Sequence, residues 1–228
     1  MSEISGAPVV HPIEVESYRI LADRVDLSDR PVSHHAIIER MIHATADLSF
    51  ATSALIGDQA PERLFDALAG GAPVIVDAAM VAAGITRYPT TCYLPRVPVA
   101  PEGSTRAAAA FRLAAEEHPE GAVFVVGNAP TALFALIEMH AAGEVDPAVV
   151  IGLPVGFVGA KESKAALWAS ALGPVSVANV GERGGSPPAA GAVNAVVRQV
   201  QTAQAAADAS KEPHESMAIP SDRERAGS

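Results

Sequence analysis

The sequence has a single cysteine, Cys92, and few aromatic residues. One thiol cannot form a disulfide within the chain, which is typical of proteins of the reducing cytoplasm. Aromatic residues make up only 4% of the 228 residues, although 49% are hydrophobic. Alanine, valine and leucine must therefore fill the interior, as they commonly do around parallel sheets. Cys92 lies in a predicted strand, so we interpret it as a core residue rather than a nucleophile.

Basic residues are also scarce, since 16 Lys and Arg against 26 Asp and Glu give a net charge of −10. This balance argues against non-specific binding to nucleic acid or to an anionic membrane. The N-terminus lacks the basic region and apolar run of a signal peptide. The stretch 122–139 is nearly free of charge, but Gly127 and Pro130 interrupt it, which favours a strand, a turn and a helix over a membrane span. We therefore expect a cytoplasmic protein with no nucleic-acid or membrane partner.

Familiar nucleotide and hydrolase motifs are absent. The sequence has no G-x-x-x-x-G-K-[ST] run, and no G-x-G-x-x-G follows a predicted strand. It also lacks the G-x-S-x-G nucleophile elbow. These absences argue against a nucleotide-dependent oxidoreductase and against a serine hydrolase of the common kind.

Short apolar runs alternate with helical segments along most of the chain. This pattern predicts an α/β fold with an open, mostly parallel sheet of about five strands, helices on both faces and an N-terminal helical segment. The predicted strands are 74–76, 91–94, 123–126, 149–153 and 175–178. The predicted helices are 13–25, 33–48, 61–69, 80–84, 106–117, 131–142, 161–171 and 189–207. We expect residues 1–207 to form a single domain and the polar segment 208–228 to be a disordered tail.

The helix that holds His43 is the first candidate for chemistry. It lies in the stretch 33–51, where isoleucine and methionine recur at helical spacing, and Ser33 is the expected N-cap. Spacing alone leaves three interpretations of His43 open. It is a hydrogen-bonded core histidine, a metal ligand together with His35 and Glu39, or a proton donor or acceptor. Zinc motifs place two histidines one turn apart, whereas His35 and His43 are two turns apart, which disfavours the metal site.

Turns at the carboxyl ends of the predicted strands are the second candidate, because ligands of open parallel sheets bind there. The first of the four turns begins at Asp77. The other three span residues 127–131, 153–163 and 181–186. Free backbone N–H groups at the helix start in 127–131 suit an anion. One glycine turn can be a simple chain reversal, but four at one edge favour a binding cleft. Four arginines near these turns are either solvated or anion-binding: Arg87, Arg96, Arg106 and Arg183.

Four segments resemble the precorrin-8X methylmutase family, which includes the cobalt-precorrin-8 enzymes. They are R-M-I-H-A-T-A-D (40–47), G-N-A-P-T-A-L-F (127–134), G-L-P-V-G-F-V-G-A-K-E-S-K (152–164) and G-E-R-G-G-S (181–186). The resemblance runs from about Ser17 to about Val197, and the segment 152–164 is its most specific part. The segment Thr45-Ala46-Asp47 is similar to the cobalt-precursor branch.

The resemblance implies an isomerase of cobalamin biosynthesis that moves a methyl group on ring C of the corrin precursor from carbon 11 to carbon 12. It implies that His43 is the catalytic acid and that the enzyme needs no cofactor and no protein-bound metal. It also implies a homodimer with a large cleft. The substrate-binding residues that we expect from the matching motifs are Ser17, Thr86, Arg87, Arg106, Asn128, Thr131, Gly184, Gly185 and Ser186. A non-catalytic corrinoid carrier and a nucleotide-dependent oxidoreductase are the alternative functions.

Overall fold

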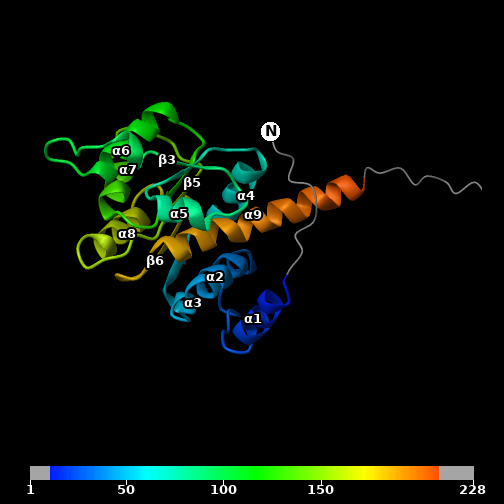
Figure 1. Cartoon of the computed structure of the whole chain (residues 1–228). Coiled ribbons are helices and arrows are strands. Elements are labelled where there is room, and N and C mark those ends of the chain that lie inside the picture. Colours follow the sequence, from blue (N-terminus) through cyan, green and yellow to red (C-terminus); the bar gives the residue numbers. More distant parts are fainter. Residues whose placement is uncertain (1–10, 211–228) are drawn as a thin grey trace, which may run out of the picture.

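The computed structural model describes residues 11–210, which form one layered α/β unit (Figure 1). Its sheet has six strands in the order β1-β6-β5-β4-β2-β3. β1 pairs with β6 in the antiparallel direction, and all other neighbours are parallel. The strands are β1 (Ala54–Ile56), β2 (Val74–Val76), β3 (Thr90–Cys92), β4 (Val123–Val126), β5 (Val149–Gly152) and β6 (Ser176–Asn179). The prediction of an open, mostly parallel sheet is confirmed, and β1 is the strand that it missed.

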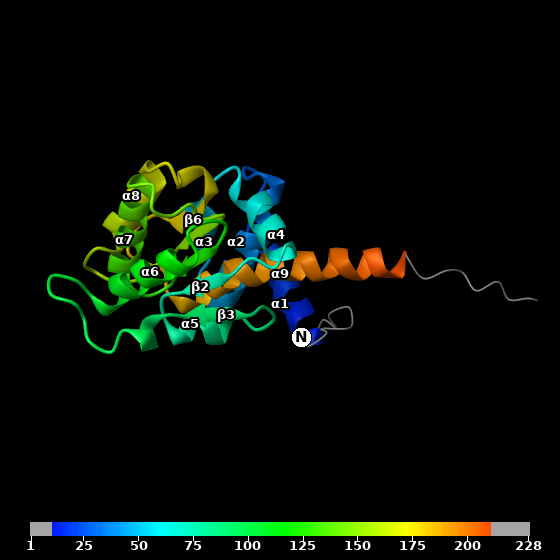
Figure 2. The same ribbon diagram turned by 90° about the horizontal axis from the view of Figure 1, so that it is seen from above.

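Helices cover both faces of the sheet, as Figures 1 and 2 show. One face carries α6 (Arg106–Glu117), α7 (Pro130–Ala141) and α8 (Ala160–Ala169). The other carries α4 (Ala60–Ala69), α5 (Ala79–Gly84) and α9 (Ser186–Ala209). Each face has its own hydrophobic cluster. Because both faces are covered, β2, β4, β5 and β6 are buried at every position, which explains the continuous apolar runs of β2, β4 and β5.

The N-terminal helices form a further layer on the α9 side. They are α1 (Pro12–Ala22), α2 (Val32–Thr45) and the short α3 (Phe50–Ser53). α2 packs along α9, and a glycine makes this close approach possible, because a Cβ atom at Gly191 would lie 3.0 Å from the carbonyl oxygen of Arg40. The C-terminal end of α9 extends beyond the layered body (Figure 2). The predicted N-terminal helical segment is therefore present, and it is attached to the sheet through α9 and β1.

Some boundaries differ from the predictions. α2 begins at Val32 with Pro31 as its N-cap, so Ser33 is not the cap, and it ends at Thr45 because Ala46 is left-handed with φ 53°. α9 begins at Ser186, since prolines are tolerated in the first turn of a helix, and it continues to Ala209. The predicted tail thus loses its first residues to α9, and residues 211–228 lie outside the part that the structure describes. Within residues 11–210, no helix has the length and apolarity needed to cross a bilayer.

Candidate active site

His43 lies in the last turn of α2 and contacts α1 through two neighbouring side chains. The hydroxyl oxygen of Ser17 is 3.0 Å from His43 Nδ1. The ring of Tyr18 stacks on the imidazole with centroids 4.9 Å apart and planes 5° from parallel. The hydroxyl and the phenol ring together fix the orientation of the imidazole. Ser17, predicted as a substrate-binding residue, is therefore placed directly against the predicted acid.

The imidazole lines a pocket with a volume of about 260 Å³. α2, the end of α5 and the first half of α9 form its walls. The side-chain amide of Asn194 donates to the carbonyl oxygen of Gly84 over 2.7 Å, which joins α9 to the end of α5 at the pocket. The lining residues are Arg40, His43, Ala44, Gly84, Pro187, Ala190, Gly191 and Asn194. The pocket thus lies between helices, and α9 connects it to the turn 181–186 at the edge of the sheet.

The surroundings of His43 favour its neutral form. Burial lowers the pKa of the imidazole below its ordinary value of 6.5, the positive charge of Arg40 lowers it further, and Glu14 opposes this shift. When His43 is protonated it is therefore a stronger acid than a solvated imidazolium. His35 points elsewhere, with Nε2 at 3.0 Å from the carbonyl oxygen of Arg30. Among residues 11–210 no three His, Cys, Asp or Glu side chains are grouped to hold a metal ion, so the alternative site of His35, Glu39 and His43 is not formed.

Two arginines converge on one carboxylate beside this pocket. Glu14 Oε1 accepts hydrogen bonds from Arg40 at 2.8 Å and from Arg198 at 3.0 Å. The same nitrogen of Arg40 lies 3.3 Å from the hydroxyl oxygen of Tyr18. This cluster joins α1, α2 and α9 at the end of the pocket that Arg40 lines.

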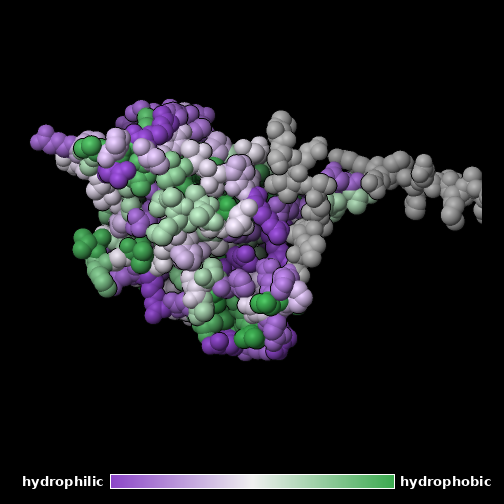
Figure 3. All heavy atoms as spheres, in the orientation of Figure 1, coloured by the Kyte–Doolittle hydropathy of each residue, from purple (hydrophilic) through white to green (hydrophobic). Residues whose placement is uncertain are grey.

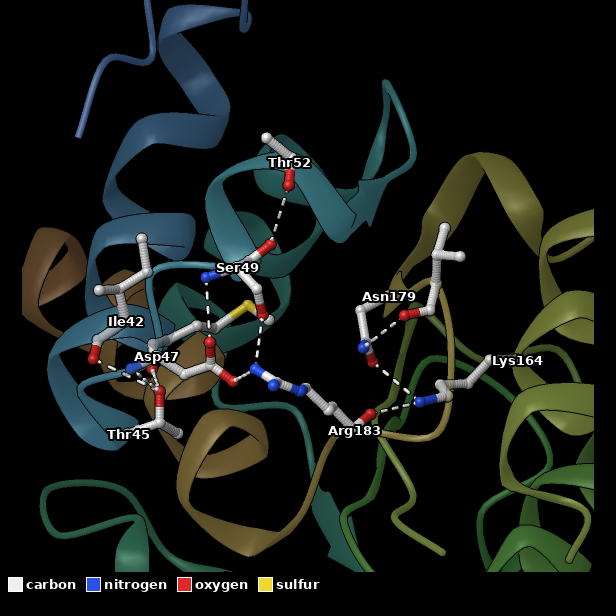
Figure 4. Close-up of polar contacts among 10 residues, drawn as sticks. Ile42, Thr45, Asp47, Ser49, Thr52, Lys164, Asn179 and Arg183 are labelled. Atoms are coloured by element: carbon white, nitrogen blue, oxygen red, sulfur yellow. Dashed lines mark hydrogen bonds and ion pairs between the residues drawn. The ribbon is translucent and has the colours of Figure 1, made fainter. Parts of the chain in front are cut away.

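The turn 181–186 is held by a buried lysine. Lys164, which is 1% exposed, donates from Nζ to Asn179 Oδ1 over 3.0 Å and to the carbonyl oxygen of Arg183 (Figure 4). Burial lowers the pKa of Lys164 to about 8, and Glu182 opposes the shift. A neutral amine has two N–H donors, which match the two oxygens that it contacts. Lys164 therefore fixes the backbone of the turn with or without its charge.

The side chain of Arg183 connects the same turn to the end of α2. Its guanidinium donates to the carboxylate of Asp47 and, over 3.0 Å, to the hydroxyl oxygen of Ser49 (Figure 4). Asp47 in turn accepts from the backbone N–H of Ser49 at 3.0 Å. These contacts fix the loop that follows His43 relative to the carboxyl edge of the sheet. Arg183 is thus engaged by the protein itself, although 66% of its side chain remains exposed to solvent.

The predicted anion site at the start of α7 is occupied by a side chain of this chain. The buried carboxylate of Asp77 accepts from the backbone N–H groups of Gly127, Asn128 and Ala129 at 3.0, 2.8 and 2.6 Å. Burial raises the pKa of Asp77, and the three N–H donors oppose that shift. The expectation that these N–H groups are free for a ligand was therefore wrong. Asp77 closes the turn instead.

The other predicted site residues fall into two groups, of which the first lies near the pocket and at the start of α9. Thr86 and Arg87 are exposed in the segment that follows Gly84, next to the pocket. Gly184, Gly185 and Ser186 lead into α9, where a Cβ atom at Gly184 would lie 2.4 Å from the carbonyl oxygen of Leu153.

The second group lies at the start of α6 and does not line the pocket. The guanidinium of Arg106 donates to the carbonyl oxygens of Val97 and Leu94 at 2.6 and 3.2 Å. The hydroxyl of Thr131 is 2.7 Å from that of Thr105, the N-cap of α6. Asn128 is exposed at the start of α7. Arg106 therefore anchors a loop in this structure through Nε and Nη2. A guanidinium has five N–H donors, so these two contacts leave donors that a substrate carboxylate can use.

Several residues of the site were not predicted from the sequence. Tyr18, Asn194 and Arg198 come from helices that meet only in the fold, so their spacing carries no signal. Arg40 and Lys164 stand inside the motifs 40–47 and 152–164 and could have been found there. Arg40 is three residues before His43, and such positions share a helix face.

The fold and the site together define an α/β protein whose pocket is built around one histidine between its helical layers. A family model described as precorrin-8X methylmutase matches residues 12–199. The chain belongs to the precorrin-8X methylmutase family, a family of isomerases of cobalamin biosynthesis.

Individual relatives carry both names used in this family. The precorrin-8X methylmutase of Pseudomonas aeruginosa is 42% identical over 200 residues, which cover 81% of this chain and 93% of the relative. The cobalt-precorrin-8 methylmutase of Salmonella typhimurium is 39% identical over 207 residues, which cover 84% and 96%. The solved structure of the precorrin-8X methylmutase from Thermus thermophilus superimposes with a TM-score of 0.75 at 34% identity, covering 84% of this chain and 96% of that one. Both names occur at similar identities, so the comparisons do not distinguish a metal-free from a cobalt-containing substrate.

Proposed function

We propose that this protein moves the methyl group on ring C of precorrin-8X, or of its cobalt counterpart, from carbon 11 to carbon 12, with His43 as the acid. The observation that carries the proposal is the position of His43, which lines the pocket while Ser17 holds its Nδ1. If the hydroxyl of Ser17 accepts from Nδ1–H, Nε2 carries the second proton of the imidazolium. That proton is available to a ring nitrogen of the substrate.

The reaction requires few other groups from the protein. The bond from the methyl group to carbon 11 breaks as the bond to carbon 12 forms, and the proton lent to the ring nitrogen returns to His43 afterwards. Such an intramolecular shift needs a shaped pocket, one acid and partners for the carboxylates of the ring. The lowered pKa of His43 suits the acid role, because a stronger acid protonates a weakly basic nitrogen more readily.

The proposed substrate contacts are the residues that the family motifs nominate at the pocket and at the sheet edge. Ser186 is supported by an independent feature, since its hydroxyl oxygen is buried without a hydrogen-bond partner in the described part of the chain. A buried hydroxyl usually has a partner, so a ligand group or a water is expected there. The full proposed set is Ser17, Thr86, Arg87, Arg106, Asn128, Thr131, Gly184, Gly185 and Ser186.

We also propose that the working form is a homodimer in the cytoplasm. A volume of about 260 Å³ is below the roughly 300–1,000 Å³ that drug-sized ligands need, and a corrin precursor is larger still. Phe157 and Val158 are 91% and 89% exposed in the loop into α8, on a side where Figure 3 shows hydrophobic residues gathered. A second copy would supply the remaining walls and cover such residues. A mass of 23.3 kDa by light scattering at micromolar concentration would refute the dimer.

The test of the function is conversion of purified methylated precursor, followed by the visible spectrum and mass analysis of the product. We expect wild-type protein to form hydrogenobyrinate, and His43→Ala to lose turnover by at least about a thousandfold because the acid is removed. His43→Ala should still fold and bind the product. His140→Ala is the matched control, since His140 contacts Val145 away from the pocket, and it should retain activity.

Three outcomes would change the assignment. A wild-type protein that binds the precursor and releases it unchanged is a corrinoid carrier. Substantial turnover by folded His43→Ala would remove His43 from the acid role while leaving the isomerase intact. A nucleotide-dependent oxidoreductase would show binding of a nicotinamide or flavin, which we do not expect because the amides at the start of α7 already hold Asp77.

A further inference from the structure

The arrangement of Glu14, Arg40 and Arg198 is unusual because two cations share one carboxylate oxygen. Glu14 Oε1 accepts from both guanidinium groups, at 2.8 and 3.0 Å. In the described part of the chain neither arginine forms an ion pair with any other acidic group. One negative charge thus faces two positive charges. The site retains a net positive charge that a second carboxylate would neutralise.

The position of this cluster relates it to the pocket. Arg40 lines the pocket together with His43, one helical turn further along α2. Arg198 lies one turn beyond Asn194, which lines the same pocket from α9. The two guanidinium groups therefore lie together at the end of the pocket that Arg40 lines. All three side chains are 27–38% exposed, so a ligand can reach them.

We propose that Arg40 and Arg198 form a subsite for a carboxylate of the ring substrate, and that Glu14 occupies this subsite in the free protein. The inference rests on the proposed function, because it takes the substrate to be a ring with several carboxylates. The carboxylate of Glu14 has the same chemistry as such a group. Paired guanidinium groups bind carboxylates through charge-assisted hydrogen bonds. Substrate binding displaces the side chain of Glu14 and leaves the contact of Ser17 with His43 in place.

The main alternative is that the cluster only fastens α1 to α2 and α9. α1 buries a single residue, Leu21, so it depends on polar contacts such as these. The two roles predict opposite effects of removing the carboxylate. If Glu14 competes with the substrate, its removal raises affinity, since the subsite no longer has to be vacated. If Glu14 is only a fastener, its removal loosens α1 and lowers affinity, as removal of Arg198 also would.

The experiment measures the dissociation constant of hydrogenobyrinate by the visible spectrum of the bound pigment. Glu14→Gln should lower the dissociation constant by about threefold to tenfold. Arg198→Gln should raise it by at least about tenfold, because a charge-assisted bond to the ligand is lost. The double variant should resemble Arg198→Gln, since Glu14 has no effect once the subsite is broken.

Matched controls come from ion pairs elsewhere in the chain. Glu16→Gln removes a carboxylate from the same helix, where it pairs with Arg19 at 2.8 Å. Arg112→Gln removes a cation that pairs with Glu138 on the far face of the sheet. Both should leave the dissociation constant unchanged. Melting temperatures of all variants show which of them still fold.

Several results would overturn the inference. Weaker or unchanged binding by folded Glu14→Gln shows that Glu14 does not occupy a ligand subsite. Unchanged binding by Arg198→Gln shows that the arginine pair does not contact the ring. A wild-type protein that neither binds nor forms the product refutes the proposed function itself, and this result is distinct from altered behaviour of the variants alone.

Discussion

At the scale of single residues, the environment of His43 sets a pH dependence. Burial and Arg40 lower the pKa of the imidazole, and Glu14 partly offsets them. An acid must be protonated to act, so kcat/KM should fall as pH rises through a midpoint below 6.5, the ordinary value for histidine. Arg40→Gln should move this midpoint upward, because the nearby positive charge is removed. The pH profile of kcat/KM measures it.

Glu14→Gln should have the opposite effect on the pH profile of kcat/KM, since loss of its negative charge should move the midpoint downward. Glu16→Gln leaves the charges around His43 unchanged and should leave the midpoint where it is. The same order of midpoints should appear in an NMR titration of the His43 ring without substrate. Midpoints that coincide in all four proteins would show that these charges do not control the acid.

At the scale of elements, the contact of α2 with α9 places His43 against the pocket. A Cβ atom at Gly191 would lie 3.0 Å from the Arg40 carbonyl oxygen and 3.4 Å from the Ala44 Cβ atom. Gly191→Val should therefore force the helices apart and lower the free energy of unfolding by about 1–3 kcal/mol. Turnover should fall as well, since the pocket loses its shape. Chemical denaturation and steady-state kinetics measure the two effects.

Ala203→Val is the control for this substitution. Ala203 lies on the same helix at an exposed position, so it tests the cost of a β-branched residue in a helix, which is below about 1 kcal/mol. An equal loss of stability in both variants would mean that the cost arises within α9 and not from its contact with α2.

The elements also show how far the sequence predicts this fold. β4 and β5 were found because their valines and isoleucines are buried on both faces and form continuous apolar runs. β1 was missed because three residues are too few to show the alternating pattern of a strand. Its antiparallel pairing with β6 also depends on contacts that form only in the folded chain. His43 and the turns at the strand ends were singled out from the sequence pattern, and the resemblance then selected the acid role among the three interpretations of His43. The Glu14, Arg40 and Arg198 cluster was not, because its members are far apart in sequence and only α1, α2 and α9 bring them together.

At the scale of the whole molecule, Lys164 links stability to pH. Its pKa is about 8 in the folded protein, below the ordinary 10.5, because the charged amine is buried. Between about pH 8 and 10.5 the unfolded chain therefore binds more protons, so the free energy of unfolding should rise with pH in that range. Below pH 8 both states are protonated and the contribution is constant. Chemical denaturation between pH 7 and 10 measures the slope.

Lys164→Met should flatten this slope whatever its effect on absolute stability. Lys161→Met is the control, because Lys161 is exposed one turn earlier on α8 and should leave the slope intact. Tyr88 and Tyr93, whose pKa values burial raises, titrate only above about pH 10 and act in the opposite direction. A slope that is the same in the wild type and in Lys164→Met would assign it to other groups.

The carboxylate of Asp77 accepts from the amides of residues 127–129, directly before α7, and this contact limits which ligands the fold can bind. In many parallel sheets that position receives a phosphate, which is why the architecture is reused for nucleotide enzymes. Here the anion is the carboxylate of Asp77, which is part of the chain. Its effective concentration at these amides therefore exceeds that of a dissolved anion. Phosphate and nucleotides should therefore not bind at this turn. A laboratory selection for nucleotide binding on this scaffold would first have to replace Asp77.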